Sequence, residues 1–229
     1  MQEFELLSLS HFLGFSICLA AIVFIPKAIH AKPGLVNFSK YLLVILLVEN
    51  QIRSTYVETF VNGGRLLENL PLHLCDFSAI VIAAFLVTGF RPLFIFAYFW
   101  GIAGAGMSIL TPDSEFAFPH DEYLATMYGH SLILLAVVFS IVNLGERPYF
   151  KDIPKLIFYS SILLVIMYGI NFILGANYWY LNERPYGDNI LSLMPEPPIH
   201  MFILYPVAIF FIYLVYSPYI FLDKRKIGV

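Results

Sequence analysis

The sequence predicts an all-α, polytopic membrane protein: a helical bundle with seven transmembrane helices. Three observations support this prediction. Of the 229 residues, 59% are hydrophobic and only 13% are charged, and the mean hydropathy of +0.78 is too high for an ordinary soluble domain. The apolar residues gather in seven runs that are each long enough to cross a bilayer. The short connections between these runs contain the residues that break helices.

Each apolar run has about the 20 residues that a transmembrane helix needs. In chain order, the predicted spans are 7–29, 38–60, 71–90, 92–110, 123–144, 155–175 and 199–222. The connections hold turn-forming residues such as Lys32-Pro33-Gly34 and Asn62-Gly63-Gly64, and the longest connection is rich in proline. No stretch is left over for a soluble domain. We therefore expect residues 1–229 to form a single seven-helix transmembrane domain.

The placement of positive charge predicts the orientation, because cytoplasmic loops carry an excess of Lys and Arg. Arg65 and Arg184 fall on one side of the seven spans. The other side carries ten such residues: Lys27, Lys32, Lys40, Arg91, Arg147, Lys151, Lys155, Lys224, Arg225 and Lys226. We therefore expect an outside N-terminus and a cytoplasmic C-terminus in the cell membrane.

The acidic start of the chain is unlike a secretory signal peptide, so we expect the first span to be retained. The net charge of −3, without a basic block, predicts no binding to nucleic acid.

Ionisable side chains inside an apolar span are costly and are therefore candidates for function. Residues 70–77, Leu-Pro-Leu-His-Leu-Cys-Asp-Phe, place His73, Cys75 and Asp76 at the outer end of the third span. On a helix beginning near Pro71, His73 and Asp76 share a face, and Cys75 points away from His73. Cys75 lies about four residues from the outer end of its span and His130 about seven from the outer end of the fifth, which is roughly 6–10 Å deep. We therefore expect Cys75 and His130 to lie at one level.

A thiol near a histidine ionises more readily, and a thiolate with a base in reach is what acyl transfer through a thioester requires. Inert alternatives stay open at this point. A lone cysteine in a transmembrane helix usually packs as a small hydrophobe, and His130 can equally form a structural hydrogen bond. The spacing of these residues matches no recognised zinc pattern, so no metal is expected.

Two further groups of polar residues have more than one interpretation. Glu49 and Arg53 are four residues apart and can pair on one helix face, either as a structural clamp or as part of a substrate site. In the proline-rich connection, the Glu183-Arg184-Pro185 sequence either caps its loop or contacts lipid phosphate. The aromatic run Asn177-Tyr178-Trp179-Tyr180 is typical of the interfacial belt of a membrane protein.

Two motifs resemble the signatures of a known family. They are Leu70–Cys75, with the sequence Leu-Pro-Leu-His-Leu-Cys, and Gly175–Pro185, with the sequence Gly-Ala-Asn-Tyr-Trp-Tyr-Leu-Asn-Glu-Arg-Pro. In this order, with a histidine in the fifth span between them, they resemble the YwaF-like integral membrane proteins, which group with vertebrate transmembrane protein 164. The likeness covers almost the whole chain. Asp76 departs from the motif, and Met194–Pro198 departs from the family pattern Leu-Gly-Pro-Trp-Pro-Trp.

The resemblance implies a phospholipid acyltransferase with lipid remodelling activity, whose substrates are membrane phospholipids and lysophospholipids. Residue by residue, it implies Cys75 as the nucleophile and His130 as its base, with His73 as a further catalytic candidate. Asp76 would then orient His73, and His73 or Asn177 would donate to the developing oxyanion. Neither a metal nor a nucleotide cofactor is implied. The topology places this active site toward the outer side of the membrane.

Two other functions stay open. A membrane lipid acyl hydrolase would use the same residues with water as the acyl acceptor. A seven-helix transporter or receptor would use Glu49 and Arg53 in a polar path near the midplane. A retinal protein is excluded, because the span 199–222 contains no lysine for a Schiff base.

Overall fold

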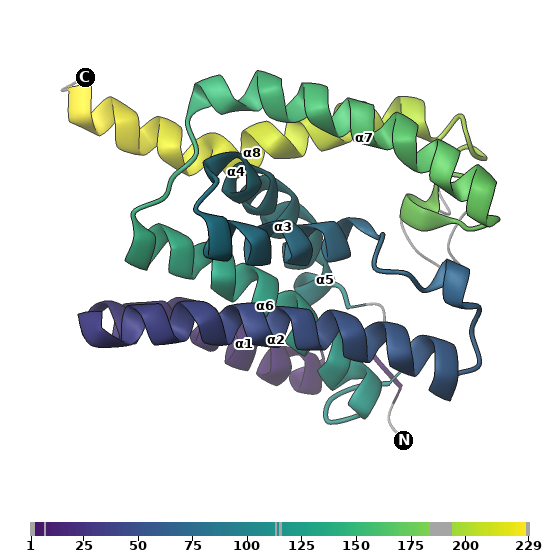
Figure 1. The fold of residues 1–229 in the computed structure, drawn as a ribbon, viewed down its shortest axis with the longest axis horizontal. Coiled ribbons are helices and arrows are strands. Elements are labelled where there is room, and N and C mark those ends of the chain that lie inside the picture. Colours follow the sequence, from purple (N-terminus) through teal and green to yellow (C-terminus); the bar gives the residue numbers. More distant parts are fainter. Residues whose placement is uncertain (1–2, 7, 113, 115, 184–193, 228–229) are drawn as a thin grey trace. The chain divides into compact units, whose positions relative to one another are not determined.

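The computed structural model describes residues 3–6, 8–112, 114, 116–183 and 194–227. Regular structure in these residues is helical, apart from an isolated bridge between Glu3 and Phe116. Figure 1 follows the helices in chain order from purple to yellow. The α-helices are α1 (Leu9–His30), α2 (Val36–Tyr56), α3 (Leu74–Thr88), α4 (Arg91–Trp100), α5 (Gly106–Leu110), α6 (Asp121–Leu144), α7 (Ile153–Leu174) and α8 (Met201–Ile227).

Six helical stretches of the described residues are long and apolar enough to cross a membrane. They are Leu9–His30, Pro33–Val61, Arg91–Leu110, Asp121–Leu144, Phe150–Leu174 and Met201–Asp223. The predicted span 71–90 contains α3, which has only 15 residues and is not among these six stretches. At 1.5 Å per residue α3 is about 22 Å long, shorter than the hydrocarbon core of about 30 Å. The all-helical, multi-pass character is therefore confirmed, whereas the count of seven spans and the orientation stay predictions.

The expectation of a helix beginning near Pro71 is wrong, because α3 begins three residues later, at Leu74. Leu70 precedes a proline, and the proline ring disfavours helical backbone in the residue before it. In addition, the Leu72 carbonyl accepts a hydrogen bond from the Trp179 indole instead of from a helical N–H. His73 consequently lies outside the helix that carries Cys75.

The predicted fourth span is a helix in three parts. A π-helical segment, Gly101–Ala105, joins α4 to α5, and a second one, Val57–Val61, continues α2. Small residues in the first segment let α6 approach closely. A Cβ atom added to Gly101 would lie only 3.0 Å from Ile133 Cγ2 of α6. π-Helical turns inside α-helices are frequent at functional sites.

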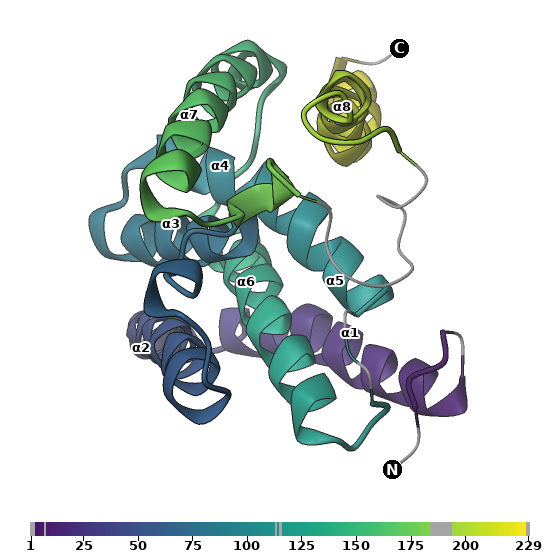
Figure 2. The same ribbon diagram turned by 90° about the vertical axis from the view of Figure 1, so that its right-hand side faces the viewer.

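The described residues form two compact units. The first comprises Met1–Arg53 and Leu74–Arg147. Within it α1 packs along α6 and α3 packs along α4, as Figures 1 and 2 show. Its core consists of fully buried side chains that include Ile82, Phe94, Phe99, Val137 and Phe139. The helices that carry Cys75 and His130 both contribute to this core.

A buried histidine ties the helices of the first unit together at one end. His11 of α1 has Nε2 3.1 Å from the Leu110 carbonyl oxygen and Nδ1 3.2 Å from the Tyr123 hydroxyl oxygen. Gly14 leaves room for this contact, because a Cβ atom there would collide with the Tyr123 ring. The contact joins α1 to the end of α5 and to α6.

The second unit comprises Ser54–His73 and Pro148–Val229. Its two long helices, α7 and α8, are joined by a hydrogen bond between the Ser161 and Tyr205 hydroxyls at 2.7 Å. The Phe150 ring, which precedes α7, packs on Tyr213 and Tyr216 of α8. Glycine in left-handed backbone ends α7 at Gly175, where φ is 62°.

Candidate active site

Cys75 lies in the first turn of α3 with a free, partly buried thiol. Two of its neighbours come from the π-helical segment Gly101–Ala105 and from α5, which follows it. The Ser108 side chain forms a hydrogen bond with the thiol, and a Cβ atom added to Gly104 would lie 3.6 Å from Cys75 Sγ. Ser108 also donates to the Gly104 carbonyl oxygen over 3.1 Å. The thiol therefore lies beside a hydroxyl and a residue without a side chain.

The Asp76 carboxylate follows Cys75 in the same helical turn. The Gln51 side chain of α2 donates from Nε2 to Asp76 Oδ1 over 2.9 Å. Asp76 is close enough to Cys75 and to His130 for its charge to interact with each of them. The thiol, the carboxylate and the imidazole therefore all belong to the first unit, and their common depth in the membrane stays a prediction.

His130 is held in a defined tautomer by its own helix. Its Nδ1 lies 2.8 Å from the Thr126 carbonyl oxygen. A carbonyl only accepts hydrogen bonds, so Nδ1 carries the proton and Nε2 presents the lone pair that a base needs. Within the described residues, no hydrogen bond joins His130 to Cys75. Catalytic hydrogen bonds often tighten only in the complex with substrate, so the pairing stays a prediction.

His73 belongs to the second unit and packs among aromatic rings. Its ring centroid lies 5.1 Å from that of Tyr178, edge to face, and 5.9 Å from that of Tyr180. Because His73 precedes α3, the helical spacing that predicted its pairing with Asp76 does not apply. The pairing and the catalytic role of His73 stay predictions.

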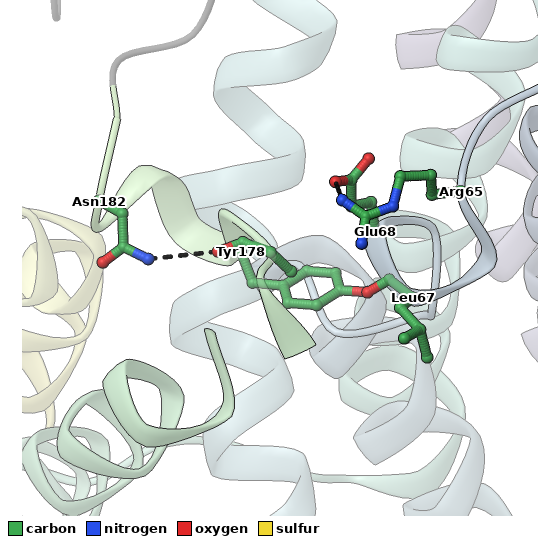
Figure 3. A network of polar contacts seen from close by, with 6 residues as sticks. Arg65, Leu67, Glu68, Tyr178 and Asn182 are labelled. Atoms are coloured by element: carbon green, nitrogen blue, oxygen red, sulfur yellow. Dashed lines mark hydrogen bonds and ion pairs between the residues drawn. The ribbon is translucent and has the colours of Figure 1, made fainter. Parts of the chain in front are cut away.

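The second motif uses its polar side chains to bind backbone groups. The Tyr178 hydroxyl accepts from the Leu70 N–H and donates to the Leu67 carbonyl oxygen, both over 2.9 Å. Figure 3 shows the Tyr178 side chain reaching Leu67, beside the ion pair of Arg65 and Glu68, whose atoms are 2.6 Å apart. One hydroxyl therefore holds the chain that leads to the first motif.

Two further contacts fix this aromatic segment. The Trp179 indole N–H donates to the Leu72 carbonyl oxygen over 2.8 Å. Asn171 of α7 accepts from the Tyr178 N–H over 2.8 Å and donates to the Tyr178 carbonyl oxygen over 2.9 Å. Trp179 and Tyr180 adopt left-handed backbone, with φ of 61° and 53°, which residues other than glycine rarely adopt. Such strain persists only where the surrounding contacts hold it.

Asn177 and Arg184 were further candidates. The Asn177 side chain donates to the Glu183 carbonyl oxygen over 2.8 Å and accepts from the N–H groups of Asn182 and Glu183. Asn177 thus orders its own loop, and its role as an oxyanion donor stays a prediction. Arg184 lies outside the described residues.

The predicted pair of Glu49 and Arg53 is present on α2. Arg53 Nε lies 3.3 Å from Glu49 Oε1, and Arg53 Nη2 donates to Asn50 Oδ1 over 2.7 Å. The Arg53 guanidinium also lies over the Tyr128 ring of α6, 5.7 Å from its centroid. Both charged side chains are partly exposed, and these contacts join α2 to α6.

Sequence reasoning missed three residues that contact the predicted site: Gln51, Gly104 and Ser108. Gln51 could have been singled out, because it is polar inside an apolar span and lies between Glu49 and Arg53. Gly104 and Ser108 have no such signal, because small residues are common in transmembrane helices. Among the described residues, no group of three or more His, Cys, Asp or Glu side chains is arranged to hold a metal ion.

The apolar helices and the buried polar groups define a multi-pass integral membrane protein with a candidate site inside its first helical unit. The chain matches the TMEM164 family over residues 3–216, and it belongs to that family. The resemblance to proteins grouped with vertebrate transmembrane protein 164 is thereby confirmed.

The chain is also similar to an uncharacterized protein of Treponema pallidum (strain Nichols), with 30% identity over 128 residues. That match covers 56% of this chain and 53% of the relative, so the chain spans about half of the relative's length. No solved structure matches the chain.

Proposed function

We propose that this protein is a membrane phospholipid acyltransferase that uses Cys75 as its nucleophile and His130 as its base, through an acyl-thioester. The observation that carries the proposal is the gathering of a thiol, a carboxylate and an imidazole on α3 and α6 inside apolar helices. Such groups are costly in a membrane span, which makes them candidates for function. Membership of the TMEM164 family supports the same proposal.

In the first step His130 Nε2 takes the Cys75 proton, and the thiolate attacks the acyl carbonyl carbon of a phospholipid. A carbon–sulfur bond forms, and the ester carbon–oxygen bond breaks. The departing lysophospholipid oxygen takes the proton from His130. An acyl group is thereby transferred to Cys75, and one lysophospholipid leaves.

In the second step His130 takes the proton of an acceptor lysophospholipid hydroxyl, whose oxygen attacks the thioester carbonyl carbon. A new ester bond forms, the carbon–sulfur bond breaks, and the thiolate recovers the proton from His130. With water as the acceptor, the same steps would make the protein a lipid hydrolase.

Ser108 supports the nucleophile in both protonation states. A hydroxyl has one proton to donate and two lone pairs that accept. While Ser108 donates to the Gly104 carbonyl, it can accept from the Cys75 S–H; once the thiolate forms, the hydroxyl can turn its proton toward the sulfur. We place the reaction at the outer side of the cell membrane, at the level of the phospholipid esters.

The direct test is acyl labelling of Cys75. Purified protein in lipid nanodiscs is incubated with phosphatidylcholine that carries an isotope-labelled acyl chain, and intact mass is measured. We expect one acyl group on the wild type and none on Cys75→Ala, with Cys18→Ala as the matched control that keeps labelling. Labelled free fatty acid as the main product would favour hydrolysis.

A different outcome would favour a transporter. If Cys75→Ala and the wild type show the same acyl turnover while Glu49→Gln abolishes uptake of a solute into proteoliposomes, the enzyme reading is wrong. The Glu49–Arg53 ion pair would then be the functional site.

A further inference from the structure

The Asp76 carboxylate is held by Gln51, a residue that has no part in the proposed reaction steps. Gln51, on α2, donates its amide N–H to Asp76 Oδ1 over 2.9 Å, in partly buried surroundings. Hydrogen bonds to an ionised acceptor are roughly twice as strong as those between neutral groups. A charge inside an apolar span also depends on such donors to remain ionised. Gln51 therefore bears on both the position and the charge of Asp76.

The Asp76 charge has two opposed effects on the proposed chemistry. Proton transfer from Cys75 to His130 creates a thiolate and an imidazolium. An ionised Asp76 repels a thiolate at the adjacent Cys75 and attracts an imidazolium at His130. Because a Coulomb energy falls with distance, the position of the carboxylate decides which effect is larger.

We infer that Gln51 is a positioning residue: its amide holds the Asp76 carboxylate where the carboxylate stabilises the imidazolium that His130 forms. This inference rests on the proposed function of the same site. His130 Nδ1 is already bound to the Thr126 carbonyl oxygen, so the incoming proton goes to Nε2. Asp76 then balances the new charge without taking the proton itself. Gln51 acts only through Asp76 and touches no substrate.

The competing explanation is that Gln51 merely ties α2 to α3. Hydrogen bonds between transmembrane helices are usually weak contributors to stability, and a purely structural tie would tolerate a different partner. A direct amide–carboxylate pair, in contrast, requires a matched length of the two side chains. The two explanations therefore differ in how a swap of side-chain lengths should behave.

The test exchanges one methylene between the two partners. Gln51→Asn shortens the amide and Asp76→Glu lengthens the carboxylate, so the double variant restores the combined reach. We expect the rate of Cys75 acylation at saturating labelled phosphatidylcholine to fall about tenfold in each single variant. In the double variant we expect it to return to within about threefold of wild type. The lipid concentration at half-maximal rate should stay unchanged, because Gln51 does not contact lipid.

Two controls separate positioning from folding. Gln51→Leu should lower the acylation rate about tenfold while its unfolding temperature in detergent stays close to that of wild type. Thr88→Val, at the far end of α3, where the Thr88 hydroxyl donates to the Ala84 carbonyl oxygen and accepts from the Phe90 N–H, should leave the rate unchanged. Wild-type rates in Gln51→Leu, or a double variant no faster than its single variants, would overturn the inference while the proposed function stands.

A wild-type protein that takes up no acyl group would overturn the proposed function instead. In that case alkylation of Cys75 by iodoacetamide tests the Gln51–Asp76 pair by itself. A changed alkylation rate in Gln51→Leu that the length swap reverses supports the pair, and equal rates in all variants overturn it.

Discussion

Residues 70–77 and 175–183 are both rich in polar and aromatic side chains, yet the structure gives them different partners. In the first stretch, Cys75 and Asp76 meet side chains from other helices, namely Ser108 and Gln51. In the second stretch, the Tyr178, Trp179 and Asn177 side chains bind backbone N–H and carbonyl groups. The first stretch therefore contains the proposed reactive groups, whereas these side chains of the second stretch order its own backbone and that of residues 67–72.

The first stretch is itself divided between the two compact units. Residues 70–73 belong with the aromatic segment, where Tyr178 and Trp179 bind the backbone of Leu70 and Leu72. Residues 74–77 begin α3 and belong with α6. The motif is thus continuous in sequence but divided between a half whose backbone is bound by the aromatic segment and a half that carries the proposed nucleophile. Variants on the two sides should separate loss of activity from loss of stability.

The largest expected effect concerns the helices that carry the proposed nucleophile and its base. We expect His130→Gln to slow Cys75 acylation by about 10²–10⁴-fold, the usual contribution of a positioned general base. Glutamine keeps a polar group but does not take a proton. His120→Gln, at the start of the same helix, should stay within about twofold of wild type. More than about a tenth of the wild-type rate in His130→Gln would remove His130 as the base.

A large effect on stability is expected in the aromatic segment that binds the backbone of residues 67–72. Asn171→Leu leaves both backbone groups of Tyr178 without their side-chain partners in a buried place. At about 1–3 kcal/mol for each unsatisfied group, the free energy of unfolding should fall by about 2–6 kcal/mol. Thermal unfolding in detergent measures this, with Asn62→Leu on the exposed surface as the control. Molecules that remain folded should acylate Cys75 within about threefold of wild type. A loss of activity without a loss of stability would contradict the comparison.

The smallest effect is expected beside His130. A Cβ atom on Gly129 would lie 2.9 Å from Asn50 Nδ2, so Gly129→Ala forces the Asn50 side chain to move and loosens its contact with Arg53. We expect a rate of acylation about threefold lower and a stability change within about 1 kcal/mol. Gly106→Ala, where an added Cβ meets open space, is the matched control in both measurements. Equal behaviour of the two variants would show that α2 does not support this side of the site.

Much of the fold could be predicted because apolar length is a local property. All seven predicted spans contain helix; the second, for example, was expected at 38–60 and is formed by α2 and the π-helical turn that ends at Val61. The start of α3 was missed, because it depends on Trp179, which is 107 residues away from Leu72 in sequence. The π-helical segment Gly101–Ala105 was also not predicted, since its apolar composition equals that of a straight helix.

The candidate site was predicted from residues that are rare in apolar spans. Cys75, Asp76 and His130 stand out because ionisable groups are unusual in apolar spans, and counting residues from the outer end put Cys75 and His130 at one level. Their neighbours could not be found in this way. Gln51 is 25 residues from Asp76, and a glycine or a serine in a membrane helix gives no sign of what it faces.

The sequence by itself determined that this protein is a multi-pass helical membrane protein of the TMEM164 family, with a thiol and an imidazole inside its apolar helices. The tertiary structure decided which helix faces pack against other helices and which stay exposed. Half of an 18-residue apolar window in Arg91–Leu110 is buried, against 17% of such a window in Leu9–His30, although both are strongly apolar. Lipid and protein interior are equally favourable to an apolar side chain, so hydropathy does not distinguish them. Hydrogen bonds distinguish these two environments, because each bond requires one particular partner at a defined distance. Gln51 forms such a bond with Asp76, and Tyr178 forms such bonds with Leu67 and Leu70.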